Sequence, residues 1–183
     1  NKEICILGLG YVGLTLSATL ADLGFKVTGV EIRKKVLDDL ENKKPHFYEP
    51  NLDKILKKII SNKNFKFYKK IPKKWTGNTY IITVGTPLDE NGSSRVDLIR
   101  NVSKEVKNSI KNNGLVILRS TVKVGTTRNI VKKIIGKKLK KFDIAFCPER
   151  TQEGKALTEV KKIPQIIGGF DERYAKRAKN IFQ

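Results

Sequence analysis

The chain has little of several residue types on which small proteins often depend. Its 183 residues include two cysteines, Cys5 and Cys147, and one histidine, His46. Two cysteines cannot form a disulfide framework and fit a reducing compartment, so we expect a cytoplasmic protein. Neither cysteine has a histidine beside it in sequence. We therefore interpret both as core residues rather than nucleophiles, and we expect no metal site.

Long apolar runs are also missing. No stretch approaches the ~20 apolar residues of a membrane span. The first expected strand begins almost at residue 1, which leaves no room for a signal peptide. We therefore expect one soluble globular domain without a membrane partner.

Acidic residues are scarce, because 18 Asp and Glu stand against 38 Lys and Arg, giving a net charge of +20. Such a balance raises the question of nucleic-acid binding. The basic residues are spread along the chain without the interleaved aromatic residues that stack bases. Lysines such as Lys132 and Lys137 fit the solvated face of a helix. We expect no nucleic-acid partner, although a positive field would speed the approach of an anionic ligand.

Apolar periodicity predicts strands that alternate with helices. The expected strands are Glu3–Leu7, Lys26–Val30, Phe65–Tyr68, Thr79–Val84, Leu115–Leu118, Asp143–Phe146 and Gln165–Gly168. The expected helices are Tyr11–Leu23, Lys34–Glu41, Leu52–Ile60, one from an Asp97 cap to Ile110, Thr126–Ile135 and Glu172–Phe182, with loops over Leu88–Arg95 and after Pro148. This alternation predicts an α/β, Rossmann-like, doubly wound fold, in which a mainly parallel sheet carries helices on both faces.

A glycine-rich turn joins the first expected strand to the first helix. Gly8 permits the sharp turn, Gly10 lets the backbone approach a pyrophosphate, and Gly13 allows the helix to pack closely on the strand. The helix N-terminus would face the phosphates with free N–H groups. Glu31 closes the second strand, near the spacing at which a carboxylate accepts hydrogen bonds from the ribose hydroxyls. The pattern predicts a dinucleotide site that prefers NAD to NADP, and we treat Arg33, a cation just beyond the acid, as secondary.

Five motifs follow one another along the chain. They are Gly8-Leu-Gly-Tyr-Val-Gly-Leu14, Glu49-Pro-Asn-Leu52, Val84-Gly-Thr-Pro87, Ser120-Thr-Val-Lys-Val-Gly-Thr126 and Cys147-Pro-Glu-Arg-Thr-Gln-Glu-Gly-Lys-Ala-Leu157. In this order they resemble the UDP-glucose/GDP-mannose dehydrogenase family over nearly the whole chain. The resemblance implies that residues 1–183 form the N-terminal NAD-binding domain of an enzyme that oxidises a sugar C6 alcohol to a carboxylate in two hydride transfers.

The resemblance also implies roles for single residues. The expected NAD contacts are Gly8, Gly10, Tyr11, Val12, Gly13, Glu31, Arg33, Val84, Gly85, Thr86, Ser120, Thr121 and Glu153. Thr121 would hold a catalytic water, and Glu149 would assist proton transfer or activate water. Glu149 and Arg150 would contact the sugar nucleotide.

Arg150 stands where the glucose and mannose branches usually have an aromatic residue. The segments Pro148-Glu-Arg, Gly154-Lys-Ala-Leu and Pro164-Gln-Ile-Ile-Gly-Gly169 look most like the branch that acts on UDP-N-acetylhexosamines, including UDP-N-acetylmannosamine.

The family's nucleophilic cysteine, which lies in a Gly-Gly-x-Cys segment of a C-terminal domain, does not occur in these 183 residues. We therefore expect a truncated chain, with the central helix and the C-terminal substrate domain outside it. By the resemblance, the full-length enzyme would be a homodimer that supplies precursors of surface polysaccharides.

Other interpretations stay open. The sugar nucleotide could be UDP-glucose or GDP-mannose. A dehydrogenase of the 3-hydroxyacid type also opens with a glycine fingerprint, although the Ser120–Thr126 and Pro148–Arg150 motifs speak against it. A third hypothesis is a non-catalytic basic Rossmann module that binds a dinucleotide or nucleic acid.

Overall fold

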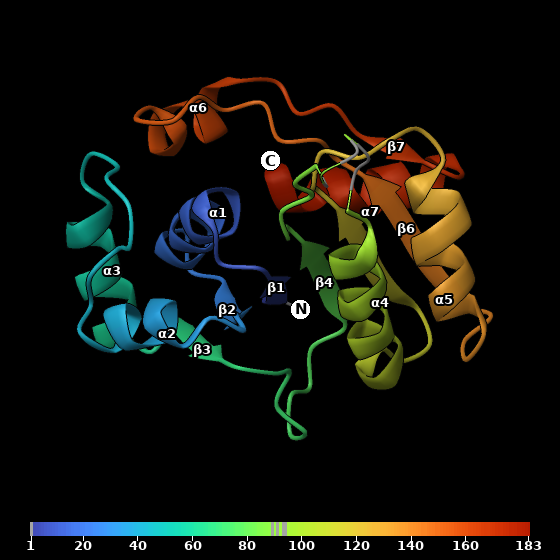
Figure 1. The fold of residues 1–183 in the computed structure, drawn as a ribbon, viewed down its shortest axis with the longest axis horizontal. Coiled ribbons are helices and arrows are strands. Elements are labelled where there is room, and N and C mark those ends of the chain that lie inside the picture. The colour runs from blue at the N-terminus through green and yellow to red at the C-terminus, as the bar shows by residue number, and fades with distance from the viewer. Residues whose placement is uncertain (1, 89, 91, 93–94) are drawn as a thin grey trace. The chain divides into compact units, whose positions relative to one another are not determined.

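The computed structural model describes residues 2–88, 90, 92 and 95–183 (Figure 1). Contacts divide the chain into two compact units. Unit 1 comprises the chain up to Gly77 together with Arg150–Pro164, and unit 2 comprises Asn78–Glu149 and Gln165–Gln183. Within the described residues, no helix is long and apolar enough to cross a membrane. The loop expected over Leu88–Arg95 lies largely outside the described residues.

Unit 1 is built from alternating strands and helices. In chain order they are β1 (Glu3–Leu7), α1 (Tyr11–Asp22), β2 (Lys26–Val30), α2 (Lys34–Glu41), α3 (Leu52–Ser61), β3 (Phe65–Tyr68) and, from the returning segment, α6 (Ala156–Lys162). The strands are parallel in the order β3-β2-β1, with Glu3 opposite Lys26 and Val27 opposite Phe65. Side chains of a strand alternate between its two faces, so Val27 and Phe65 share one face, which packs against α1 and α3.

Unit 2 contains the remaining elements. They are β4 (Thr79–Ile82), α4 (Asp97–Ser109), β5 (Gly114–Leu118), η1 (Thr127–Lys132), α5 (Lys133–Gly136), β6 (Phe142–Phe146), β7 (Gly168–Gly169) and α7 (Glu172–Phe182). Strands β4, β5 and β6 are parallel, and β7 joins β6 antiparallel. Helix α7 lies on the face that carries Asp143, which accepts hydrogen bonds from Arg173 and Arg177. The expected mainly parallel, Rossmann-like α/β fold is confirmed.

Two expected elements are wrong in detail. The segment after Pro148 is not loop throughout, because α6 forms at Ala156–Lys162. The strand expected at Gln165–Gly168 is only the two-residue β7, and it runs antiparallel to β6. Glycines suit this position, since a Cβ at Gly169 would lie 2.7 Å from the backbone nitrogen of Ala175.

Smaller differences concern helix starts and geometry. Asp97 is the first residue of α4 and not its cap, and it pairs with Arg95 instead. The segment expected as a helix at Thr126–Ile135 is helical from Thr126 onward, and it has π geometry over Thr127–Lys132.

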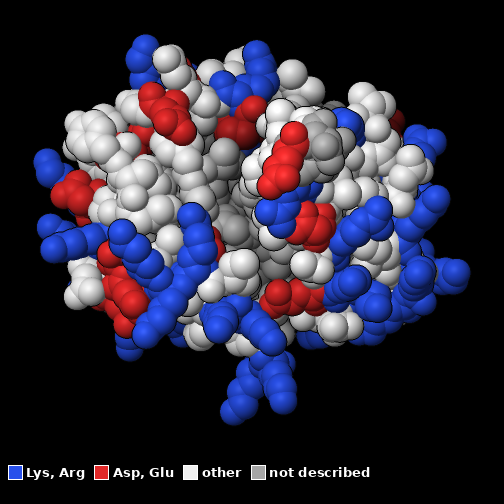
Figure 2. All heavy atoms as spheres, viewed as in Figure 1, with Lys and Arg blue, Asp and Glu red and all other residues white. Residues whose placement is uncertain are grey.

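Both cysteines lie in the core, as expected, with no exposed surface. Burial raises the pKa of Cys147 to about 12, although the charge of Arg119 opposes the shift. This thiol is therefore protonated at neutral pH, which does not suit a nucleophile. The lysines expected on a solvated helix face are exposed (Lys132, Lys133, Lys137 and Lys138). Figure 2 shows Lys and Arg scattered over the visible surface.

The core of unit 1 has no spare room at Gly29 of β2. A Cβ there would lie 2.8 Å from Leu9 Cδ1 and 2.9 Å from Phe65 Cε2, and both of these side chains are buried. We predict that Gly29→Ala lowers the free energy of unfolding by about 1–3 kcal/mol, as overpacking of a core does. Chemical denaturation of the purified chain measures this change.

Gly136 provides the matched control, because a Cβ at this helical glycine would meet nothing within 4 Å. Gly136→Ala should leave the stability unchanged or raise it by about 0.4–1 kcal/mol. Equal effects of the two substitutions would contradict the packing argument.

Candidate cofactor and substrate site

The turn between β1 and α1 leaves an open helix terminus. Gly8, with a φ of +97°, turns the chain after β1, and its N–H donates to Val30 O at 2.8 Å. Gly10 is the N-cap residue of α1, which has no side-chain cap and no acidic residue in its first turn. A Cβ at Gly10 would meet nothing within 4 Å. The first N–H groups of α1, at Tyr11, Val12 and Gly13, therefore form a terminus suited to an anion.

Glu31 follows β2 directly and is only 5% exposed. One carboxylate oxygen accepts the Leu9 N–H at 3.1 Å, so Glu31 also fixes the glycine-rich turn. Arg33 donates from its backbone N–H at 2.9 Å, from Nε at 3.1 Å and from Nη2 at 2.9 Å. Burial alone would raise the pKa of Glu31, but the hydrogen bonds from Arg33 and Leu9 bring it below its ordinary value. The carboxylate is therefore ionised at neutral pH.

This geometry bears on the expected role of Arg33. Two of its guanidinium nitrogens already bind Glu31, so the charge of Arg33 is balanced by this carboxylate. The secondary role expected for Arg33 agrees with this pairing.

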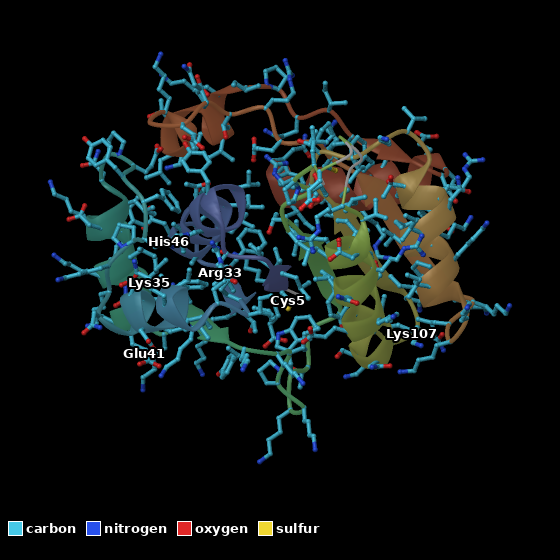
Figure 3. All side chains as sticks on the ribbon, in the orientation of Figure 1. Cys5, Arg33, Lys35, Glu41, His46 and Lys107 are labelled. Atoms are coloured by element: carbon cyan, nitrogen blue, oxygen red, sulfur yellow. The ribbon has the colours of Figure 1, made fainter. Side chains whose placement is uncertain are left out.

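His46 belongs to the same unit, and Figure 3 labels it together with Arg33. Burial and the nearby charge of Arg33 lower the pKa of His46, so the imidazole is neutral at pH 7.

Tyr11 and Glu49 hold the returning segment of unit 1 in place. Glu49 is 4% exposed and accepts the Tyr11 hydroxyl at 2.8 Å, the Gly154 N–H at 2.9 Å and the Leu157 N–H at 3.2 Å. Burial, together with the hydrogen bond to Glu49 and its charge, raises the pKa of Tyr11. The Tyr11 hydroxyl thus helps to fix segment 150–157, while the backbone N–H of Tyr11 lies in the first turn of α1.

The returning segment carries two of the expected site residues. Glu153 is exposed and directly precedes Gly154, so Glu49 fixes the backbone next to it. Arg150 is exposed and donates to Pro164 O at 3.2 Å. Both side chains are accessible to a ligand.

In unit 2 the expected residues pair across the ends of β4 and β5. The Thr86 hydroxyl donates to Thr121 O at 2.5 Å, and the Ser120 hydroxyl donates to Val84 O at 2.6 Å. Thr121 itself is exposed, as is Gly85. Thr121 lies six residues before η1, so it is not a helix cap. Its hydroxyl can therefore serve a ligand or a water.

Glu149 is held by a fully buried arginine. Arg119, at the end of β5, donates from Nε to Glu149 Oε2 at 2.9 Å. Its Nη2 lies 2.7 Å from the same oxygen as an ion-pair contact without hydrogen-bond geometry. Its Nη1 donates to Gln165 Oε1 at 2.9 Å, and the guanidinium stacks on the Phe182 ring at 5.0 Å.

Sequence reasoning gave no role to Arg119 or Glu49. The position of Arg119 directly after the apolar run Leu115–Leu118 is the signal in the sequence that could have indicated a buried ion pair. Glu49 was part of a quoted motif, but its partners come from residues 105 and 108 positions further along the chain.

The residues of unit 1 fit a dinucleotide. An uncapped helix N-terminus matches a pyrophosphate, and an ionised carboxylate beside it matches ribose hydroxyls. This combination, on a parallel α/β fold, defines a protein of the dinucleotide-binding class.

Comparisons with known proteins give the family. Residues 2–183 match the profile described as UDP-glucose/GDP-mannose dehydrogenase family, NAD binding domain, and the chain belongs to this family. It is 37% identical to the UDP-N-acetyl-D-mannosamine dehydrogenase of Methanocaldococcus jannaschii, covering all of this chain and 42% of that protein.

Two solved structures are similar over 98% of this chain. One is a UDP-glucose dehydrogenase from Pyrobaculum islandicum, with a TM-score of 0.90, 30% identity and 43% of that chain covered. The other is the UDP-D-ManNAc dehydrogenase from Pyrococcus horikoshii, with a TM-score of 0.91, 29% identity and 44% covered. The chain thus spans less than half the length of these relatives.

The buried ion pair generates a stability prediction. Arg119→Met should lower the free energy of unfolding by about 3–5 kcal/mol, because it leaves the Glu149 carboxylate, whose side chain is only 9% exposed, without its cation. Denaturant titration, with the remaining native signal read by circular dichroism, measures the change.

The exposed pair of Arg95 and Asp97 serves as control, since these side chains are 50% and 48% exposed. Arg95→Met should cost no more than about 1 kcal/mol. A loss of stability below about 1 kcal/mol for Arg119→Met would show that the buried pair contributes no more than an exposed one, and would contradict the prediction.

Proposed function

We propose that this chain is the NAD-binding domain of a nucleotide-sugar 6-dehydrogenase. The substrate we propose is a UDP-N-acetylhexosamine, with UDP-N-acetylmannosamine first, oxidised at C6 to the uronic acid in two NAD-dependent steps. The family match over residues 2–183 carries the proposal. The name of the Methanocaldococcus jannaschii relative and Arg150 in the Pro-Glu-Arg motif support this sugar. UDP-glucose and GDP-mannose are the alternative substrates.

NAD supplies the acceptor for the hydride that leaves the C6 carbon of the sugar. We propose that the N–H groups of Tyr11, Val12 and Gly13 bind its pyrophosphate, with Gly8 and Gly10 giving the backbone access. Glu31 would accept hydrogen bonds from the ribose hydroxyls, while Arg33 would keep the Glu31 carboxylate oriented. Val84, Gly85, Thr86, Ser120, Thr121 and Glu153 are proposed as further cofactor contacts.

For catalysis we propose that the Thr121 hydroxyl orients a water and that Glu149 accepts or passes on a proton. Arg119 would fix the orientation of the Glu149 carboxylate for this task through its contacts to Oε2. Glu149 and Arg150 would contact the sugar nucleotide.

The wider setting is proposed on the same basis. We propose a cytoplasmic homodimer that provides precursors for surface polysaccharide, with neither nucleic acid nor membrane as partner. The opposing hypothesis, a basic module for nucleic acid, predicts binding of random duplex DNA with a steep salt dependence.

The Glu31–Arg33 pair predicts a strong preference for NAD. The 2′-phosphate of NADP would meet the Glu31 carboxylate as a like charge and lose the ribose hydrogen bonds, which is worth about 2–4 kcal/mol, or roughly 30- to 1,000-fold in affinity. Calorimetric titration of the chain with each cofactor measures the ratio.

The variant Glu31→Ser should bring the dissociation constants of NAD and NADP closer together. It removes the repulsion of the 2′-phosphate and releases the Arg33 guanidinium, which can then bind that phosphate. Glu41→Ser, at an exposed carboxylate in α2, should leave the ratio unchanged. Equal dissociation constants for NAD and NADP in the unmutated chain would refute the role of Glu31.

A second prediction concerns turnover in a protein that carries this chain together with the remaining length of its relatives. Thr121→Ala should lower kcat for UDP-N-acetylmannosamine by ~10²–10⁴ with NAD affinity nearly unchanged, as expected when an acid–base contact is lost. Thr121→Ser keeps the hydroxyl and should retain most of the activity. If Thr121→Ala instead weakened NAD tenfold at normal kcat, Thr121 would act only as a cofactor contact and its catalytic role would be refuted.

A further inference from the structure

Unit 1 has a concave surface on the face of its strands opposite α1 and α3. By the register of the strands, Glu3, Lys26, Thr28, Lys66 and Tyr68 all point to this face. They line a pocket of about 500 Å³, within the range of small-molecule sites. Glu3 and Lys26 begin β1 and β2, whereas the glycine-rich turn follows the end of β1. Tyr68 ends β3, and its backbone oxygen accepts the Glu31 N–H at 3.0 Å, but none of the lining residues belongs to the glycine-rich turn. The pocket is therefore distinct from the dinucleotide turn.

The opposite wall of the pocket is the segment Pro72–Thr76, which follows β3. The Thr76 hydroxyl donates to Glu3 Oε2 at 2.9 Å, and the Trp75 N–H donates to Pro72 O at 2.9 Å. The half-buried Trp75 ring packs on Gly77, where a Cβ would lie 2.4 Å from the ring. Backbone and side-chain contacts thus hold an aromatic ring at the pocket wall.

The charge of the pocket is strongly positive. Four lysines line it (Lys26, Lys63, Lys66 and Lys74), against the single carboxylate of Glu3. Lys26 donates to the neutral amide of Asn64 at 2.7 Å, so its charge is not balanced there. Within the described residues, no carboxylate lies within 4 Å of the Lys66 or Lys74 ammonium group. An anion would be attracted by these charges, which come from four separate positions on the chain.

From this combination we infer that unit 1 carries a second ligand site, formed by Lys26, Lys66, Lys74 and Trp75, for a nucleoside phosphate. The ammonium groups bind the phosphates, and the indole and the Tyr68 ring provide flat apolar surface for the base. The site requires neither the dinucleotide turn nor the proposed dehydrogenase activity.

The fluorescence of Trp75 tests this inference, because the sequence has a single tryptophan. The chain is titrated with ADP, adenosine or pyrophosphate in the absence of NAD, because NAD itself carries an adenosine diphosphate group that this site would bind. We expect saturable quenching by ADP, binding of adenosine that is at least about tenfold weaker, and competition by pyrophosphate. No saturable change with ADP would overturn the proposal.

Charge-matched variants locate the binding. Lys66→Gln with Lys74→Gln should weaken ADP about tenfold or more, as loss of two charged contacts does. Lys104→Gln with Lys176→Gln removes the same charge at exposed helical positions of unit 2 and should leave ADP binding unchanged. Equal weakening by the two pairs would show an unspecific field effect and overturn the site. Displacement of ADP by a single-stranded oligonucleotide at far lower concentration would overturn the assignment to a small nucleotide.

Discussion

The arrangement of unit 2 depends on how the buried Arg119 guanidinium is paired. A charged group without exposed surface is tolerated only when it is paired, because its desolvation costs several kcal/mol. Arg119 meets this demand with Glu149, Cys147 O, Gln165 and Phe182, which belong to four separate positions after β5. One side chain thereby contacts the chain just after β6, at the returning Gln165, and at Phe182 of α7. A proposed catalytic carboxylate is part of this pairing, so its position is a property of the fold.

Glu31 combines two tasks in a similar way. Its carboxylate fixes the Leu9 N–H within the glycine-rich turn and simultaneously holds Arg33. The residue proposed to select the cofactor is therefore also a structural part of the glycine-rich turn. Replacing Glu31 therefore removes a charge and also two contacts that hold the turn and Arg33 in place.

Most of the fold could be predicted because its signals are local. The bounds of β1, β2, α2, β3 and α7 follow from apolar periodicity and from the turn residues beside them. Helix α6 could not be predicted this way, since its Leu157 N–H is satisfied by Glu49 from a distant segment. The antiparallel β7 likewise depends on pairing with Phe146 and not on its own apolar run. Among the site residues, sequence gave the ends of the strands but not the arginine that holds Glu149.

The discontinuity of unit 1 has a consequence for synthesis of the chain. Glu49 needs the N–H groups of Gly154 and Leu157, and the latter is added 108 residues later. At roughly 5–20 residues per second, the ribosome reaches it about 5–20 seconds after Glu49. During this interval the apolar face of α1 and α3 can form, whereas the Glu49 carboxylate must stay hydrated. Unit 1 is thus begun first and completed only after most of unit 2 has been synthesised, so the order of folding is nested and not sequential.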